Sequence, residues 1–193
     1  MKIIVWDVDD ILNNLMYCWF TRKWLPEHPD CKLTYEQITE NTPERLLNCT
    51  REEYLASLDD FRLSEMYPEM KPNNEVLAWF EKYGDRARHI ALTAVPIEAA
   101  HVSAAWVMKN YGKWIRSFNF VPSTRRDKTI PEYDNTKAEY IKRLGTVDIF
   151  IEDNEENIKG VKEKSLLVSR PWNKGKDSMQ QVLDKITKMI KEG

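Results

Sequence analysis

Three acids near the start of the chain, Asp7, Asp9 and Asp10, have the residue types and spacing for phosphate or metal chemistry. They directly follow residues 2–6, a short apolar and β-branched run that is typical of a strand buried on both faces. Side chains two residues apart in an extended chain point the same way, so the first two acids are expected on one side. Their mutual repulsion favours a bound cation or a raised pKa on one of them. The alternative is a strand end with solvated acids or a helix cap.

Polar groups follow two later apolar runs in the same manner. Thr93 comes after residues 88–92, and Glu152 and Asp153 come after residues 147–151. Ligands of open α/β sheets bind in the crevice beyond the carboxyl ends of the strands, so these groups are expected to meet the first acids there. Carboxylates from different strands, with water and a substrate phosphate, supply the oxygen ligands that Mg²⁺ prefers. Taken alone, the threonine predicts only a strand-end hydrogen bond, and the later acids only a solvated turn or N-cap.

These groups depend on a regular alternation of strands and helices. The apolar spacing predicts strands at residues 2–6, 88–92, 117–122, 147–151 and 165–168. It predicts helices at residues 12–24, 34–41, 43–48, 51–61, 73–83, 97–111, 136–144, 155–163 and 178–191. This alternation is typical of an α/β fold, a Rossmann-like doubly wound parallel sheet with right-handed crossovers.

The long helical stretch after the first strand predicts a small cap inserted into the sheet domain. The expected division is an α/β core of residues 1–12 and 72–193, with a helical cap at residues 13–71. The first cap helix carries four aromatic residues at helical spacing: Tyr17, Trp19, Phe20 and Trp24. They are expected either in the core or as a surface that stacks a base or ring.

Composition narrows the classes of function. The 193 residues are 42% hydrophobic and 31% charged with a net charge of -2, so a globular core is expected and a basic nucleic-acid surface is not. No apolar stretch has the length of a membrane span, and the N-terminus has no signal-peptide pattern. We therefore expect a cytoplasmic protein that binds neither a nucleic acid polymer nor a membrane. A small phosphorylated metabolite is the partner that the family resemblance given next implies. The oligomeric state stays open, a homodimer included.

In order along the chain, these motifs resemble the haloacid dehalogenase-like (HAD) hydrolase superfamily. The resemblance covers the whole chain and rests on DVDDI at residues 7–11, IALT at 90–93 and IFIED at 149–153. The sequence departs from the usual pattern at Asp10, where glycine is frequent, and at Glu152, which replaces the first acid of a pair. The helical stretch is similar to the small cap of one class within that superfamily.

The resemblance implies a role for each of four residues. Asp7 would be the nucleophile that forms an aspartyl-phosphate, and it would also bind Mg²⁺. Asp9 would protonate the leaving alcohol and then activate water, with its backbone carbonyl as a further metal ligand. Thr93 would hydrogen-bond the transferring phosphoryl group, and Asp153 would complete the protein's metal ligands. A group that acts first as acid and then as base suits hydrolysis in two steps.

The resemblance also implies a lysine that stabilises the phosphoryl charge, and the sequence offers two. Lys137 begins an apolar helix and is preferred because the helix anchors it, while Lys128 lies in a polar loop at residues 123–135. A solvated surface lysine is the alternative for either one. The implied substrate contacts are Thr93, Ala94 and Lys128.

Two short motifs refine the expected substrate. RDKT at residues 126–129 and PWN at residues 171–173 are similar to bacterial relatives of the 5'(3')-deoxyribonucleotidases. The expected function is a Mg²⁺-dependent phosphomonoester hydrolase of the 5'-nucleotidase kind, acting on a nucleoside 5'-monophosphate. A phosphatase for a sugar or another small metabolite is an alternative, as is a non-catalytic binding module with this fold. The second acid, Asp9, argues against a carbon–halogen hydrolase.

Overall fold

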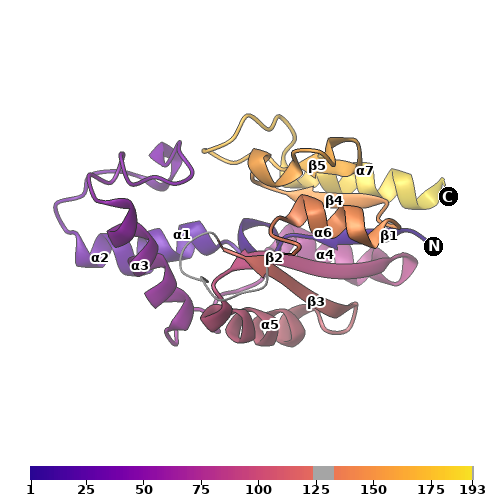
Figure 1. Ribbon diagram of the computed structural model, residues 1–193, viewed down its shortest axis with the longest axis horizontal. Coiled ribbons are helices and arrows are strands. Elements are labelled where there is room, and N and C mark those ends of the chain that lie inside the picture. The colour runs from indigo at the N-terminus through magenta and orange to yellow at the C-terminus, as the bar shows by residue number, and fades with distance from the viewer. Residues whose placement is uncertain (124–132, 193) are drawn as a thin grey trace.

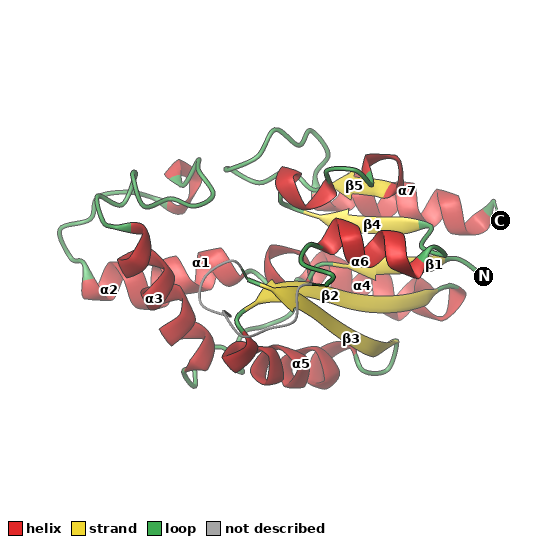
Figure 2. Cartoon of the chain, in the orientation of Figure 1, coloured by secondary structure: helices red, strands yellow, loops and turns green. Residues whose placement is uncertain are grey.

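The computed structural model describes residues 1–123 and 133–192, and its centre is one parallel sheet with helices on both faces (Figures 1 and 2). Five strands form the sheet in the order β3-β2-β1-β4-β5. Their bounds are β1 Ile3–Trp6, β2 Arg88–Val95, β3 Ile115–Pro122, β4 Ile149–Glu152 and β5 Ser165–Leu167. The predicted Rossmann-like α/β fold is confirmed.

The first strand is buried on both faces, as its sequence predicts. Ile4 and Trp6 belong to one apolar cluster and Val5 to another, and all three side chains are fully buried. Successive side chains of a strand point to opposite faces, so these clusters lie on the two sides of the sheet. Helices α4, α5 and α7 contribute to the first cluster and α6 to the second. The helices are α1 Leu15–Trp19, α2 Leu25–Glu27, α3 Arg51–Leu63, α4 Asn74–Tyr83, α5 Ile97–Tyr111, α6 Lys137–Leu144 and α7 Met179–Lys191.

The order of the strands places a crevice beside β1. The chain passes outward from β1 to β2 and β3, and then returns to β4 and β5 on the other side of β1. Trp6 pairs in register with Ala91 of β2 and with Ile151 of β4. Beyond this level β1 ends, β4 ends one residue later at Glu152, and β2 continues to Val95 beside β3, so that Thr93 belongs to the strand. A reversal of strand order of this kind is where α/β sheets bind ligands.

The segment between β1 and α4, residues 13–71, is here called the helical insertion. Figure 1 shows its helices α1, α2 and α3 at one end of the sheet, opposite the two chain termini. Trp19 and Phe20 of the insertion belong to the same apolar cluster as Trp6 of the sheet. That the insertion is a domain separate from the sheet stays a prediction.

The aromatic residues of the insertion are core residues, with one exception. Trp19, Phe20 and Trp24 are buried, whereas Tyr17 is 49% exposed. The Trp19 indole N–H donates to the Ser57 hydroxyl at 3.1 Å and so joins α1 to α3. Three of the four side chains are therefore unable to stack against a ligand.

Three of the predicted helices are wrong. Residues 34–41 contain only the 3₁₀ turn η3 (Tyr35–Gln37), although its Thr34 capping box forms. Residues 44–48 form a hydrogen-bonded turn, and residues 155–163 form two 3₁₀ turns, η5 (Glu155–Ile158) and η6 (Lys162–Lys164). Such short segments lack the length that makes helix propagation outweigh nucleation. Shorter elements elsewhere are η1 Val8–Leu12, η2 Phe20–Trp24 and η4 Gly84–Arg86. Across the residues that are described, no helix has both the length and the apolar character of a membrane span.

Candidate active site

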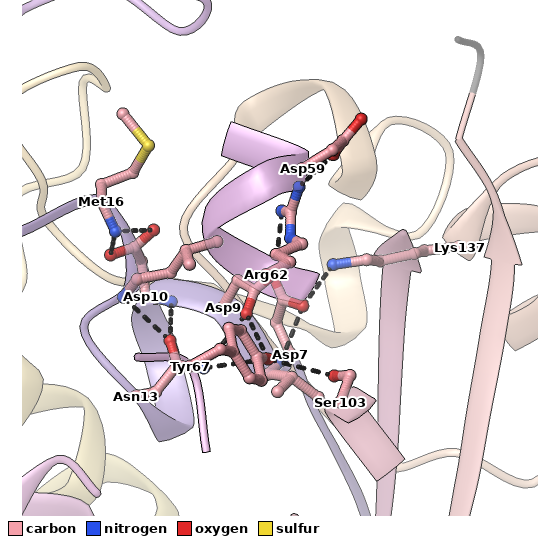
Figure 3. Close-up of polar contacts among 12 residues, drawn as sticks. Asp7, Asp9, Asp10, Asn13, Met16, Asp59, Arg62, Tyr67, Ser103 and Lys137 are labelled. Carbon is pink, nitrogen blue, oxygen red and sulfur yellow. Dashed lines mark hydrogen bonds and ion pairs between the residues drawn. The ribbon is translucent and has the colours of Figure 1, made fainter. Parts of the chain in front are cut away.

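A buried lysine lies between two carboxylates at the carboxyl edge of the sheet. The Lys137 Nζ is 2.6 Å from Asp7 Oδ1 and 2.7 Å from Glu152 Oε2. All three side chains are at most 6% exposed. Lys137 is the first residue of α6. Thr136 caps the N-terminus of this helix, because its hydroxyl accepts a hydrogen bond from the Glu139 N–H. The predicted helix start thus places the preferred lysine directly against the expected nucleophile (Figure 3).

The shared lysine gives the two acids different proton affinities. Burial raises the pKa of Asp7 well above its usual value; the adjacent Glu152 raises it further, and Lys137 only partly opposes this. Burial also works against the charge of Glu152, but Lys137 outweighs it and the pKa of Glu152 is lowered. Burial would lower the pKa of Lys137, yet its two acidic neighbours hold that pKa above its usual value. Lys137 therefore favours the charged form of Glu152 more than that of Asp7, and a further cation beside Asp7 would favour its ionised form.

The same edge of the sheet holds an acidic cluster suited to a metal ion. Asp7, Glu152 and Asp153 each offer a carboxylate oxygen, and these oxygens lie within 4.8 Å of one another. All three residues are buried, and burial, Glu152 and Asp10 together raise the pKa of Asp153 well above its usual value. When all of them are ionised, the three carboxylates and the ammonium group of Lys137 leave two negative charges, which a divalent cation would balance. A set of oxygen ligands fits a hard cation such as Mg²⁺.

Asp9, two residues beyond the expected nucleophile, has a separate set of partners. Its carboxylate accepts hydrogen bonds from Arg62 Nη2 at 3.0 Å, the Tyr67 hydroxyl at 3.1 Å and Asn13 Nδ2 at 3.1 Å (Figure 3). Arg62 also contacts Asp59 through Nη1 at 3.1 Å. The structure therefore brings Asp7 and Asp153 together as predicted, with Glu152 as the third acid of the cluster. The Asp9 side chain is directed to the helical insertion instead.

Asp10 occupies a backbone conformation that explains its departure from the expected glycine. Its φ of 61° lies in the left-handed region, which glycine and, to a lesser extent, aspartate adopt. Its carboxylate accepts the Met16 N–H at 3.0 Å, and Asn13 Oδ1 accepts the Asp10 N–H at 3.1 Å. Burial raises the pKa of Asp10 to about 7, against the opposing charge of Arg170. Asp10 therefore closes the turn after β1 while its side chain binds the start of α1.

These groups open onto a cavity of about 290 Å³ between the sheet edge and the insertion. Thr93 and Ala94 of β2 line it, as the predicted substrate contacts would. The insertion supplies the facing wall, formed by Leu15, Met16, Asn41, Thr42, Arg51, Tyr54, Leu55, Leu58 and Arg62. Lys128, with the whole motif at residues 126–129, lies outside the described residues.

Two residues of the insertion that bind Asp9 were missed by the sequence analysis. Arg62 and Tyr67 are separated from Asp9 by more than 50 residues of sequence. A signal for the arginine exists in α3, where Tyr54 and Leu58 define the buried face and Arg62 follows four residues after the leucine. A charged residue on the buried face of a helix indicates a buried acidic partner.

Among known proteins, the chain resembles solved structures in its fold rather than in its sequence. No protein-family model matches the sequence, and no curated protein sequence is similar to it. Among solved structures, a haloacid dehalogenase-like hydrolase from Streptococcus pneumoniae is 11% identical with a TM-score of 0.60, over 95% of this chain and 90% of that one. The YfnB protein of Bacillus subtilis, described as a HAD hydrolase and solved with magnesium, is 12% identical with a TM-score of 0.56, over 98% of both chains.

A third solved structure is the HAD family hydrolase of Deinococcus radiodurans, which contains bound phosphate and sodium. It is 10% identical with a TM-score of 0.50, over 86% of this chain and 79% of that one. These three solved structures are all described as HAD or haloacid dehalogenase-like hydrolases. At these identities the likeness establishes the fold, and the chemistry has to be argued from the site.

Proposed function

We propose that this chain is a Mg²⁺-dependent phosphomonoester hydrolase of the HAD type. The observation that carries the proposal is the meeting of Asp7, Lys137, Glu152 and Asp153 at the point where the strand order reverses. A nucleophilic carboxylate, a fixed ammonium group and further acidic ligands are the groups that displacement at a phosphate dianion requires. The magnesium bound to one structural neighbour and the phosphate bound to another support a metal-dependent phosphate hydrolase.

The proposed reaction has two steps. In the first, an Asp7 carboxylate oxygen attacks phosphorus, the bond from phosphorus to the ester oxygen breaks, and the Asp9 carboxyl gives its proton to the leaving alcohol. The product is an aspartyl-phosphate on Asp7. In the second, the Asp9 carboxylate takes a proton from a water molecule as that water attacks phosphorus. The bond to Asp7 breaks, and inorganic phosphate and the original carboxylate result.

The surrounding residues have distinct tasks in this reaction. Lys137 and Thr93 would hydrogen-bond the oxygens of the transferring phosphoryl group, since both line the cavity. Asp7 and Asp153, with Glu152 beside them, would hold the cation, which supplies positive charge that offsets the repulsion between carboxylate and phosphate. Asp9 has to exchange its contacts with Arg62 and Tyr67 for the leaving oxygen before it can donate a proton.

A nucleoside 5'-monophosphate is the first substrate to test. The similarity of residues 171–173 to deoxyribonucleotidases supports it, and a cavity of about 290 Å³ suits a small ester. The buried state of Trp19, Phe20 and Trp24 removes them as stacking groups for a base. A phosphorylated sugar or another small metabolite therefore remains the alternative to compare.

The test is phosphate release from a panel of nucleoside monophosphates and sugar phosphates, with Mg²⁺ and with chelator. Asp7→Asn keeps the size of the side chain but removes the nucleophile, and we expect turnover to fall by at least about 1,000-fold. Asp148→Asn is the matched control, because Asp148 lies at the opposite end of β1, where it accepts the Ile3 N–H. Its turnover per folded molecule is expected to equal that of the wild type.

A binding module with the same fold predicts a different result. Such a protein would bind a phosphate ester without releasing phosphate, and Asp7→Asn would leave the bound fraction unchanged. Release that is insensitive to both chelator and Asp7→Asn would contradict the metal-dependent mechanism. The preferred ester in the panel decides between the nucleotide and the sugar phosphate.

A further inference from the structure

The PWN motif at residues 171–173 forms a turn that the proposed reaction does not use. Asn173 fixes this turn from inside, because its Nδ2 donates to the backbone carbonyls of Asp153 at 2.6 Å and Val168 at 2.8 Å. Its Oδ1 accepts the N–H groups of Arg170 at 3.2 Å and Gly175 at 2.8 Å. One amide side chain thus ties the turn after β5 to the loop after β4.

Trp172 extends from this turn to the acidic cluster. Its indole Nε1 donates a hydrogen bond of 2.9 Å to Oδ2 of Asp153, a residue that is itself only 6% exposed. A hydrogen bond from a rigid indole fixes the rotation of the carboxylate and occupies one of its two oxygens. Asp153 also offers one carboxylate oxygen to the cluster that it forms with Asp7 and Glu152.

The Trp172 ring is also held by the helical insertion. Tyr35 meets it edge-on, with ring centroids 6.1 Å apart and an interplanar angle of 85°. Tyr35 in turn meets Tyr17 edge-on at 5.3 Å. From the same turn, Arg170 Nε donates to the backbone carbonyl of Asp10 at 3.1 Å. The turn therefore contacts the loops after β1 and β4, where the acids of the cluster lie, and the insertion above them.

We propose that Trp172 is a positioning residue for the metal site, holding Asp153 in the single orientation that completes the cation's oxygen ligands. This inference rests on the proposed function, because it takes the acidic cluster to be a metal site. Partners of metal ligands commonly contribute to affinity by orienting the ligand, and their loss costs about 10- to 100-fold in metal affinity. A Trp172 that only packs against Tyr35 would leave that affinity unchanged.

The test measures the affinity for Mn²⁺, as a paramagnetic probe of the Mg²⁺ site, by the electron paramagnetic resonance signal of the free ion. Trp172→Phe removes the indole N–H and keeps an aromatic ring, and we expect Mn²⁺ to bind about 10- to 100-fold more weakly. Trp24→Phe is the matched control: Trp24 is equally an indole, but its buried Nε1 has no partner within the described part of the chain. Its Mn²⁺ affinity is expected to equal that of the wild type.

A second measurement, by ¹⁹F nuclear magnetic resonance, follows Trp172 in the wild-type protein itself. With 5-fluorotryptophan in place of its 7 tryptophans, the protein gives ¹⁹F resonances that the two phenylalanine variants assign. Saturating Mg²⁺ is expected to shift the Trp172 resonance and to leave that of Trp24 in place. A Trp172 resonance that does not respond would contradict the proposal even if a variant folds poorly.

The outcomes separate this inference from the proposed function. Equal Mn²⁺ affinities of the wild type and Trp172→Phe, with metal-dependent phosphate release intact, would overturn the role of Trp172 alone. A wild-type protein that binds no Mn²⁺ would overturn both the metal site and the inference that depends on it. Weaker binding in Trp172→Phe but not in Trp24→Phe supports the proposal.

Discussion

Two groups of charges border the cavity, and each consists of one cation between two acids. In the first, Lys137 lies between Asp7 and Glu152. In the second, Arg62 lies between Asp9 and Asp59. We call them the lysine triad and the arginine triad. Both have the same net charge, yet different parts of the molecule build them.

The lysine triad belongs to the sheet, and the arginine triad depends on the helical insertion. The acids of the lysine triad lie at the ends of neighbouring strands, Asp7 directly after β1 and Glu152 as the last residue of β4. The register of these strands fixes their separation, and their side chains are at most 6% exposed. Asp9 and Asp59 are 13% and 19% exposed, and α3 of the insertion carries Asp59 and Arg62. A shift of the insertion would therefore alter the contacts of Asp9 and leave the lysine triad in place. The comparison indicates that the sheet fixes Asp7, the expected nucleophile, while the insertion holds Asp9, the expected proton donor.

The largest effect is expected from removing the cation of the lysine triad. Lys137→Met leaves Asp7 and Glu152 buried without a counter-charge, so we expect the free energy of unfolding at neutral pH to fall by about 3–5 kcal/mol. Added Mg²⁺ should restore part of the loss, because a ligand that binds only the folded state stabilises it. Urea unfolding measures both values.

The control for this change is an exposed lysine in an ion pair. Lys159 pairs with Glu156, and both side chains are about 70% exposed, at 69% and 71%. Lys159→Met is therefore expected to change stability by less than about 1 kcal/mol. If Lys137→Met were equally mild, the lysine triad would not be the tightly buried unit that the comparison requires.

A smaller loss is expected from the arginine triad. Arg62→Met leaves Asp9 and Asp59 partly accessible to water, so we expect a loss of about 1–3 kcal/mol in the same unfolding experiment. Arg62→Lys, which keeps the charge but has fewer donors, should fall between this variant and the wild type. A loss as large as that of Lys137→Met would erase the distinction between the two triads.

The release of protons on metal binding should also distinguish the acidic cluster of the metal site from the arginine triad. Burial raises the pKa values of Asp7 and Asp153, so a fall in pH protonates them sooner than ordinary carboxylates, and a metal has to displace those protons. Affinity for Mn²⁺ should therefore fall as the pH falls through the raised pKa values, by up to about tenfold per pH unit for each proton released. Calorimetry in two buffers of different ionisation enthalpy counts the protons. Asp153→Asn should reduce the number of protons released on metal binding, and Arg62→Met should not. Equal binding heats in both buffers would contradict the coupling of metal binding to proton release.

The smallest effect concerns the wall of the cavity that faces the lysine triad. Arg51 at the start of α3 lines the cavity and is exposed, and its charge acts on nearby Glu44. We expect Arg51→Gln to raise the KM for esters with a second anionic group by up to about fivefold, the value of an exposed charge pair, without changing kcat. The KM for 4-nitrophenyl phosphate, which has no second anion, is the control. An equal change for both esters would exclude a role in recognising the leaving group.

Sequence analysis was most successful where the information is local. Three local signals are each contained within a few residues: the apolar run before Asp7, the capping of α6 before Lys137 and the strand that carries Thr93. Short helices were the local failures, because a capping box such as that of Thr34 starts a turn but does not decide whether the next residues find a face to pack against.

Contacts between segments that are distant in the chain could not be predicted from the sequence. The partner of Asp9 is Arg62, 53 residues later, and the partner of Asp153 is Trp172, 19 residues later across another strand. The PWN motif was visible in the sequence, but its contact with an acidic residue was not. The aromatic pattern of the insertion likewise could not decide between core and ligand surface, since both uses need the same spacing.

The sequence by itself determined that the chain forms a parallel α/β sheet and that acids, a threonine and a lysine follow its buried segments. It could do so because burial and helix capping leave periodic patterns in neighbouring residues. Only the tertiary structure decided that β4 lies beside β1, that Glu152 shares Lys137 with Asp7, and that Asp9 is held by the insertion. Strand order and long-range ion pairs depend on how whole elements pack, and no local pattern in the chain encodes that choice.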